Sequence, residues 1–181
     1  MALREIVKFP DPRLKKVSAP IVEITDEHRE LARDMIEVMY DEPGIGLAAP
    51  QVGENIRLVV VDTDWTEEDT ERNAMVVVNP ELLEPEGKIT WNEGCLSVPD
   101  FTADVERAER VLLRGTDLDG NPIEERLEDL KAVCFQHEID HLDGVLFIDR
   151  ISRLKRSMYV KKRKKQLLAE EEDEGESRTQ L

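Results

Sequence analysis

Two histidines four residues apart, His137 and His141, are the residues of this sequence whose spacing points most directly to chemistry. They belong to the segment His-Glu-Ile-Asp-His, which has the pattern H-E-x-x-H. On an α-helix, residues four apart lie one turn above each other on the same face, so two imidazole nitrogens can bind one metal ion. Glu138 is offset from His137 by roughly 100° of helical turn, so its carboxylate can contact a metal-bound water without being a ligand. We therefore predict a helical metal site; the alternative is that both histidines only pack in a core.

A metal ion held by two histidines needs a third protein ligand and an open position for water and substrate. Cys95, in the segment Glu-Gly-Cys-Leu-Ser, is the preferred candidate because a thiolate binds first-row divalent metals well. A lone cysteine is more often a small buried apolar residue, and we interpret Cys134 in that way. His28 is expected on the exposed side of an early helix, so we interpret it as a surface residue.

The segment 44–53 (GIGLAAPQVG) is unusually rich in small residues. Such residues let another backbone approach closely, as it would beside an extended peptide. Within it, Gln51 could donate a neutral amide N–H to a developing oxyanion. The segment also fits a tight structural turn. It is not a phosphate-binding loop, because no Gly-Lys-Ser/Thr follows.

The helix that carries the two histidines must turn them toward the interior. We expect it to begin after Asp129, whose carboxylate can cap it, and to end at Gly144, which suits a left-handed stop. Steps of three and four residues place the histidines on an apolar stripe. The stripe consists of Leu130, Val133, Cys134, His137 and His141.

Other elements have weaker signals. An earlier helix is expected from Thr25 or Asp26 to Pro43 and Gly44. Its apolar face consists of Leu31, Ala32, Met35, Ile36 and Met39. Three prolines predict an extended arm over residues 9–21. β-Branched runs predict strands, and the pair Asp119-Gly120 predicts a hairpin turn. The expected strands are residues 56–62, 75–79, 87–91, 105–116 and 122–128, with a surface connection at 64–73.

Length, apolar content and net charge limit the number of domains and the kinds of partner. At 181 residues, with 40% apolar residues, the chain fits one domain. Its net charge of −16 argues against nucleic-acid or anionic-membrane binding by the whole surface. The charge is uneven, with a basic block at 153–165 and an acidic one at 170–176. No apolar stretch approaches the ~20 residues that span a bilayer, so we expect a cytoplasmic protein with no membrane contact and with two unpaired cysteines.

Three segments together resemble a known family. GIGLAAPQ (44–51), EGCLS (93–97) and HEIDHLDG (137–144), in this order, are similar to the three signature motifs of peptide deformylases. The similarity extends over residues 5–153. It implies an α+β fold with antiparallel strands packed around the helix that bears the histidines. It also implies a catalytic domain at 1–153. A charged tail follows at 154–181; low complexity predicts no packed structure after about residue 165, whereas the resemblance suggests that the basic block could form a helix.

The resemblance implies a role for each site residue. The metal ligands would be Cys95, His137 and His141. Metal-bound hydroxide would attack the formyl carbon of formyl-methionine on nascent polypeptides and release formate, with Glu138 as general base and then general acid. The Gln51 side chain and the Leu96 N–H would stabilise the oxyanion, and the Gly46 backbone would contact the substrate amide. One departure is Thr102, near the position of a peptide-holding arginine in many bacterial relatives.

The resemblance also implies a cofactor and partners. Fe²⁺ is expected in cells, with Zn²⁺, Ni²⁺ or Co²⁺ able to substitute. The expected partners are N-formylated nascent peptides and, through the basic segment 155–165, the ribosome; a monomer is expected.

Two other classes of protein compete with this interpretation. A zinc peptidase would take its third ligand from downstream, but no histidine follows His141 and the acids beyond Asp149 lie in the charged tail. An inactive binding module, such as a ribosome-associated one, would not need an intact set of Cys95, Glu138 and Gln51. Metal analysis and a formate-release assay would separate the three.

Overall fold

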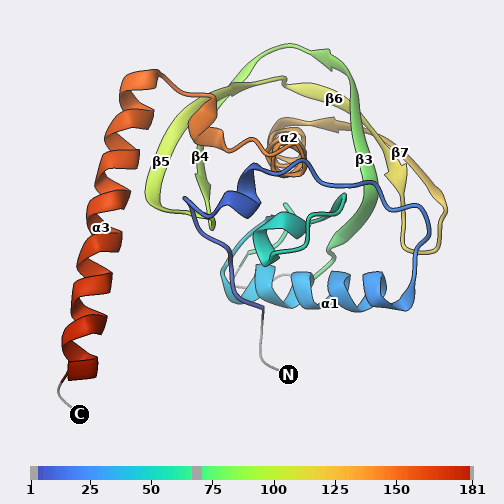
Figure 1. The fold of residues 1–181 in the computed structure, drawn as a ribbon. Coiled ribbons are helices and arrows are strands. Elements are labelled where there is room, and N and C mark those ends of the chain that lie inside the picture. Colours follow the sequence, from blue (N-terminus) through green and yellow to red (C-terminus); the bar gives the residue numbers. More distant parts are fainter. Residues whose placement is uncertain (1–3, 67–70, 180–181) are drawn as a thin grey trace. The chain divides into compact units, whose positions relative to one another are not determined.

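The structure, a computed structural model, describes residues 4–66 and 71–179, with the backbone alone for 173–179. The chain forms two compact units, residues 1–147 and 148–181. The first unit carries the helices α1 (Asp26–Asp41) and α2 (Asp129–Leu142) and the strands (Figure 1). The second carries the long helix α3 (Arg153–Thr179).

The strands of the first unit form two antiparallel sheets. One has five strands in the order β1-β2-β3-β6-β7, and the other pairs β4 with β5. The bounds in the first sheet are β1 (Gly46–Ala48), β2 (Leu58–Val61), β3 (Met75–Glu86), β6 (Arg110–Thr116) and β7 (Pro122–Glu128). Those in the second are β4 (Ile89–Cys95) and β5 (Val98–Arg107). The predicted α+β class, with antiparallel strands around the helix of the two histidines, is therefore confirmed.

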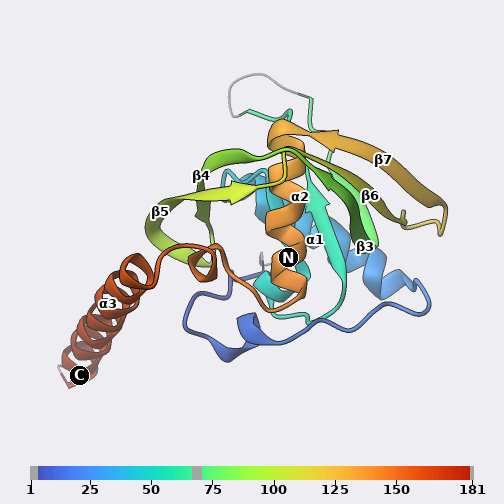
Figure 2. The same ribbon diagram turned by 90° about the horizontal axis from the view of Figure 1, so that it is seen from above.

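Strand β2 explains how the large sheet supports two helices. Successive side chains of a strand point to opposite faces of the sheet. Leu58 and Val60 belong to the core beneath α1, whereas Val59 and Val61 belong to the core beneath α2. Both helices pack against β2, and Figure 2 shows α2 crossing the sheet. A strand buried on both faces must be apolar throughout, as the run Leu-Val-Val-Val is.

Helix α1 follows its prediction closely. It begins at Asp26, after the N-cap Thr25. The Thr25 backbone N–H donates to Nδ1 of His28 at 3.0 Å. His28 thus has a local role at the start of α1, consistent with its interpretation as a surface residue. Of the predicted apolar face, all but Ile36 are buried.

Several predicted boundaries are wrong. The arm contains a short 3₁₀ helix (Pro12–Lys15) that buries Leu14. The single strand predicted at 105–116 is divided into β5 and β6, because the Gln136 side chain takes both the N–H and the C=O of Ala108, at 3.0 and 2.9 Å. Glu128, and not Asp129, is the N-cap of α2, and its side chain makes no capping hydrogen bond. The predicted stop is confirmed, since Gly144 has φ of +72°.

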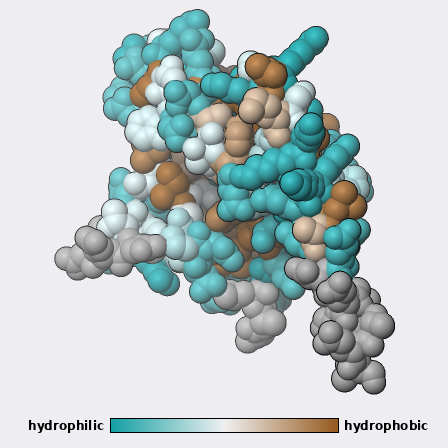
Figure 3. Space-filling view, turned by 90° about the vertical axis from the view of Figure 1, so that its left-hand side faces the viewer, coloured by the Kyte–Doolittle hydropathy of each residue, from teal (hydrophilic) through white to brown (hydrophobic). Residues whose placement is uncertain are grey.

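Two further segments concern the expected tail and surface connection. Helix α3 covers the expected charged tail and continues to Thr179. The predicted surface connection at 64–73 lies partly outside the described residues, since 67–70 are not described. In the described ranges, no helix is both long and apolar enough to cross a membrane. On the face in Figure 3, hydrophilic residues dominate and hydrophobic residues form separate patches.

Candidate metal centre

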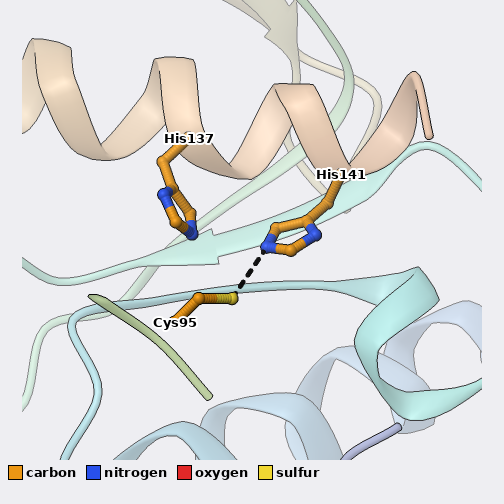
Figure 4. Close-up of side chains that lie close together, drawn as sticks. All are labelled: Cys95, His137 and His141. Atoms are coloured by element: carbon orange, nitrogen blue, oxygen red, sulfur yellow. Dashed lines mark hydrogen bonds between the residues drawn. The ribbon is translucent and has the colours of Figure 1, made fainter. Parts of the chain in front are cut away.

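Three side chains from two elements converge beside α2. His137 and His141 project from one face of the helix toward Cys95, the last residue of β4 (Figure 4). One ligand atom from each residue lies within 4.8 Å of the other two. Cys95 Sγ lies 3.3 Å from Nε2 of His141. Among the described residues this is the group of cysteine, histidine and carboxylate side chains whose geometry could hold a metal ion.

Glu93 controls the orientation of His137. A carboxylate oxygen of Glu93 lies 2.9 Å from Nδ1 of His137. An ionised carboxylate only accepts hydrogen bonds, so Nδ1 carries the proton and Nε2 keeps its lone pair for a metal. Burial alone would raise the pKa of Glu93, but hydrogen bonds from Arg107 and His137 outweigh it and lower this pKa to about 2.

Arg107, from β5, extends the same network. Its guanidinium donates to both oxygens of Glu93, at 2.7 and 2.9 Å, and to Asp140 at 2.6 Å. All three residues are buried. Buried charges are tolerated when they are paired and hydrogen-bonded, and a bidentate arginine–carboxylate pair is among the strongest such contacts.

Glu138 is a buried carboxylate with unused hydrogen-bonding capacity. Its Oε2 atom has no hydrogen-bond partner in the described structure, and neither does Nδ1 of His141. Burial is the largest cause that raises the pKa of Glu138 to about 7. A carboxyl group poised near neutrality suits proton transfer. An unpaired carboxylate oxygen beside a Cys-His-His donor set fits a divalent ion with a water molecule in an open position.

Gln51, from the glycine-rich segment, also contacts the cysteine. Its carbonyl oxygen accepts from the Ala48 backbone N–H at 2.9 Å, which fixes the direction of the amide. Its NH₂ group then donates to Ser97 Oγ at 3.2 Å and points at Cys95 Sγ at 3.6 Å. The glycine-rich segment and the EGCLS segment are therefore in direct contact at the candidate centre.

A pocket of about 630 Å³ opens onto these residues. Its lining comes from the start of β1, from strands β4 and β5, and from α2. The residues predicted for the site that line it are Gly46, Gln51, Cys95, Leu96, His137 and Glu138. Apolar side chains form a further part of the lining, including Ile45, Leu130 and Val133. Such a pocket can bury an apolar side chain next to the candidate ligands.

Comparison with known proteins identifies the family. The family model for polypeptide deformylases matches residues 3–157. The chain belongs to the polypeptide deformylase family. A peptide deformylase of Alkalilimnicola ehrlichii is 53% identical over 165 residues, which cover 91% of each chain. The crystal structure of a peptide deformylase from Legionella pneumophila has a TM-score of 0.83 and 42% identity, and covers 93% of this chain and 98% of its own.

A deformylase from Ehrlichia chaffeensis, in complex with actinonin, has a TM-score of 0.84 at 34% identity and covers 92% of this chain and 98% of its own. Family membership establishes the activity. Like other peptide deformylases, this chain is a hydrolase of protein biosynthesis that removes the N-terminal formyl group from nascent polypeptides. The family is metal-dependent, and the Cys95, His137 and His141 side chains form a group that could bind the ion.

The sequence did not single out the network behind the ligands. Glu93 and Asp140 lie inside the motifs, and Arg107 lies near the end of β5. Their chemistry as charged residues suggests a solvated surface, yet each is at most 8% exposed. A usable signal was present for Arg107, because it alternates with the buried Val105 and Ala103 and thus shares their face of the strand. Cys134 is buried and unpaired, as predicted.

Proposed function

We propose that Cys95, His137 and His141 hold one divalent ion at which this deformylase cleaves its substrate. The approach of the three ligand atoms to within 4.8 Å of one another carries this proposal. When bound, the ion would act as a Lewis acid and lower the pKa of a water molecule toward neutrality. Two histidines and a thiolate leave one position open for that water and the formyl group.

Glu138 moves the proton in this proposal. Its carboxylate takes a proton from the attacking water as the C–O bond forms at the formyl carbon. It then delivers the proton to the amine nitrogen as the C–N bond breaks, which yields formate and a free α-amine. Two observations support this role. Burial raises the pKa of Glu138 to about 7, and its Oε2 atom is a free hydrogen-bond acceptor.

Gln51 and Leu96 stabilise the charge that develops on the formyl oxygen. The Gln51 amide is held by Ala48, so its NH₂ group is already directed toward Cys95 before substrate arrives. The backbone N–H of Leu96, next to that cysteine, supplies the second donor. Preorganised donors of this kind are typically worth about 3 kcal/mol each in the transition state.

The substrate lies as an added strand between β1 and β4, with its amide at the Gly46 backbone. Both strands border the pocket, and β1 ends the order of the larger sheet, so it can accept a new strand. Ile45, Leu130 and Val133 offer an apolar lining that suits a methionine side chain. Thr102 also lines the pocket, and its short side chain gives less hold on the peptide beyond methionine than an arginine would.

We also propose the identity of the metal ion, the extent of the catalytic domain and the cellular setting of the enzyme. Fe²⁺ is the ion used in cells, with Zn²⁺, Ni²⁺ or Co²⁺ able to substitute at a site of two nitrogens and one sulfur. Residues 1–153 form the catalytic domain. The protein acts in the cytoplasm as a monomer, and the basic segment 155–165, which lies in α3, contacts the ribosome.

Single substitutions separate ligands from the proton carrier. Cys95→Ala, His137→Ala and His141→Ala should each lose metal and activity together. Glu138→Gln preserves size and hydrogen bonding but removes basicity. It should retain about one metal per chain and bind a formyl-peptide analogue, while formate release falls by ~10²-fold or more. Metal analysis and formate release from a formyl-Met peptide provide the measurements.

The opposite pattern has a clear meaning. Full formate release by a metal-loaded Glu138→Gln enzyme would refute the assigned proton carrier, even though the protein is a deformylase. Histidine variants that unfold more easily but keep their metal would show that His137 and His141 only pack the core. A wild-type protein with neither metal nor formate release would favour an inactive binding module.

A further inference from the structure

We propose that Arg107 is a positioning residue that, through Glu93 and Asp140, holds the two ligand-bearing elements at the spacing required for metal binding. The inference rests on the metal centre proposed above and assigns a role to a side chain outside the three motifs. Arg107 does not itself line the pocket, and its hydrogen bonds go to Glu93 and Asp140 and not to the ligand atoms. It acts through the two carboxylates.

The guanidinium of Arg107 uses its three nitrogens on two different elements. Nε and Nη2 bind the two oxygens of Glu93, at 2.7 and 2.9 Å, and Nη1 binds Asp140 at 2.6 Å. Glu93 belongs to β4 and Asp140 to α2. The planar fork of an arginine fixes both the distance and the angle between its partners, which a lysine ammonium cannot do. Arg107 therefore ties β4 to α2 through one rigid group.

Each end of this tie lies next to a proposed ligand. Glu93 precedes Cys95 by two residues on the same strand, and Asp140 immediately precedes His141 on the helix. Cys95 and the histidines come from elements 42 or more residues apart in the chain, so no local structure sets their spacing. Contacts between distant elements must set it, and the Arg107 side chain is one of them, because it binds both Glu93 of β4 and Asp140 of α2.

Glu93 adds a direct link to the remaining ligand. While both of its oxygens accept from Arg107, Oε2 also accepts from Nδ1 of His137, at 2.9 Å. That bond fixes the ring orientation and directs Nε2 away from Glu93. Outer partners of this type commonly change metal affinity or activity by 10- to 100-fold when they are mutated. The arginine holds the carboxylate, and the carboxylate holds the imidazole.

A purely structural role makes a different forecast. The side chains of Arg107 and Glu93 are only 3% and 4% exposed, and that of Asp140 is 11% exposed. Removal of one partner from a buried pair leaves an uncompensated charge and destabilises a protein without regard to metal. The test must therefore measure the metal site separately from stability. Co²⁺ suits this purpose, because its visible spectrum reports ligand identity and geometry.

Two conservative variants form the test in the full-length protein. Glu93→Gln is near-isosteric but places an NH₂ group where an acceptor is needed. Asp140→Asn leaves the Arg107–Glu93 pair intact and weakens the link from Arg107 to α2. We expect Glu93→Gln to raise the Co²⁺ dissociation constant, measured by chelator competition, by about 10- to 100-fold. Asp140→Asn should raise it less, and both should shift the Co²⁺ absorption bands.

Control variants and folding measurements distinguish a specific effect on metal binding from a general loss of stability. Arg114→Gln breaks an exposed pair with Glu124 between β6 and β7, so it should leave Co²⁺ binding unchanged. Arg107→Lys should fall between wild type and Glu93→Gln. Circular dichroism and unfolding of the metal-free proteins report on the fold.

The outcomes are distinguishable. Wild-type Co²⁺ affinity and spectra in Glu93→Gln and Asp140→Asn would overturn the inference, whatever their loss of stability. The metal centre itself would still stand if Cys95→Ala and His137→Ala lost Co²⁺. Retention of Co²⁺ by those two ligand variants would instead refute the metal centre.

Discussion

Among single residues, Gly46 is a position where the proposed site leaves no room for any side chain. A Cβ atom at this position would lie 2.6 Å from Glu138 Oε1 and 2.7 Å from Cys134 Sγ. Both distances are shorter than real contacts. The density of small residues at 44–53 predicted the close approach of another backbone. In the structure, side chains of α2 occupy this space, and one of them is the proposed proton carrier.

Gly46→Ala should therefore impair catalysis through Glu138. The added methyl group must displace the carboxylate, and a shift of about 1 Å in a catalytic group can cost ~10²-fold in rate. We expect kcat/KM for a formyl-Met peptide to fall by about 10- to 100-fold, with metal content unchanged. Loss of metal together with activity would instead place the damage at the ligands.

The ligand set predicts how the enzyme responds to air. Cys95 is only partly buried, and it lines the open pocket, so oxygen can reach it. An Fe²⁺ form should lose activity under aeration, as the iron and the Cys95 sulfur oxidise, whereas Ni²⁺ and Zn²⁺ forms should persist. Activity half-lives in air and under nitrogen provide the comparison. Equal half-lives of the Fe²⁺ and Ni²⁺ forms in air would contradict this chemistry.

At the scale of elements, one asparagine attaches the N-terminal arm to the sheet. Asn79, in β3, has a left-handed φ of +50°. Its side-chain oxygen accepts from the Ile21 N–H and its NH₂ group donates to the Ile21 C=O, each at 2.8 Å. The arm thus gains both backbone hydrogen bonds of a strand residue from a single side chain. Asparagine tolerates the left-handed conformation better than most residues.

Substitutions at Asn79 should separate hydrogen bonding from backbone strain. Asn79→Ala loses two hydrogen bonds of about 1 kcal/mol each and adds about 1 kcal/mol of strain, so the free energy of unfolding should fall by roughly 3 kcal/mol. Asn79→Gly also loses the bonds but adopts a positive φ without strain, so its loss should be about 1 kcal/mol smaller. Denaturant unfolding measures both. Equal losses would mean that strain contributes nothing.

At the scale of the whole molecule, charge is separated along the chain. The net charge of −16 comes from 41 acidic and 25 basic residues, yet the first half of α3 is strongly basic. The second half of the same helix contains the acidic block 170–176. A basic segment on an otherwise acidic protein supports the proposed contact with the ribosome, since the remaining surface repels a polyanion.

Deletion of the residues after Arg153 should separate this role from catalysis. Co-sedimentation with ribosomes should weaken, and the difference from the full-length chain should shrink as salt rises. Turnover of a small formyl peptide should stay nearly unchanged. Replacement of Glu170, Glu171 and Glu172 by Gln is the matched control and should not weaken co-sedimentation. Unaltered co-sedimentation of the deletion variant would remove the ribosome from the proposal.

The sequence by itself determined the local features of this protein. The spacing of His137 and His141 is a helical property, so their shared face followed from the pattern alone. The span of α1 and the stop at Gly144 followed in the same way, because capping, turns and hydrophobic periodicity act over a few residues. The α+β class followed from the resemblance to the family. Three ordered motifs also implied the family, which the comparisons confirm.

Contacts between distant segments were decided only by the tertiary structure. Gln136 ends β5 by bonding to Ala108, which is 28 residues away, and no signal within 105–116 predicts that break. Arg107 likewise meets a carboxylate 14 residues before it and another 33 residues after it. A charged residue has the same appearance in a sequence whether it is solvated or buried. Its partners decide which, and only folding brings them together.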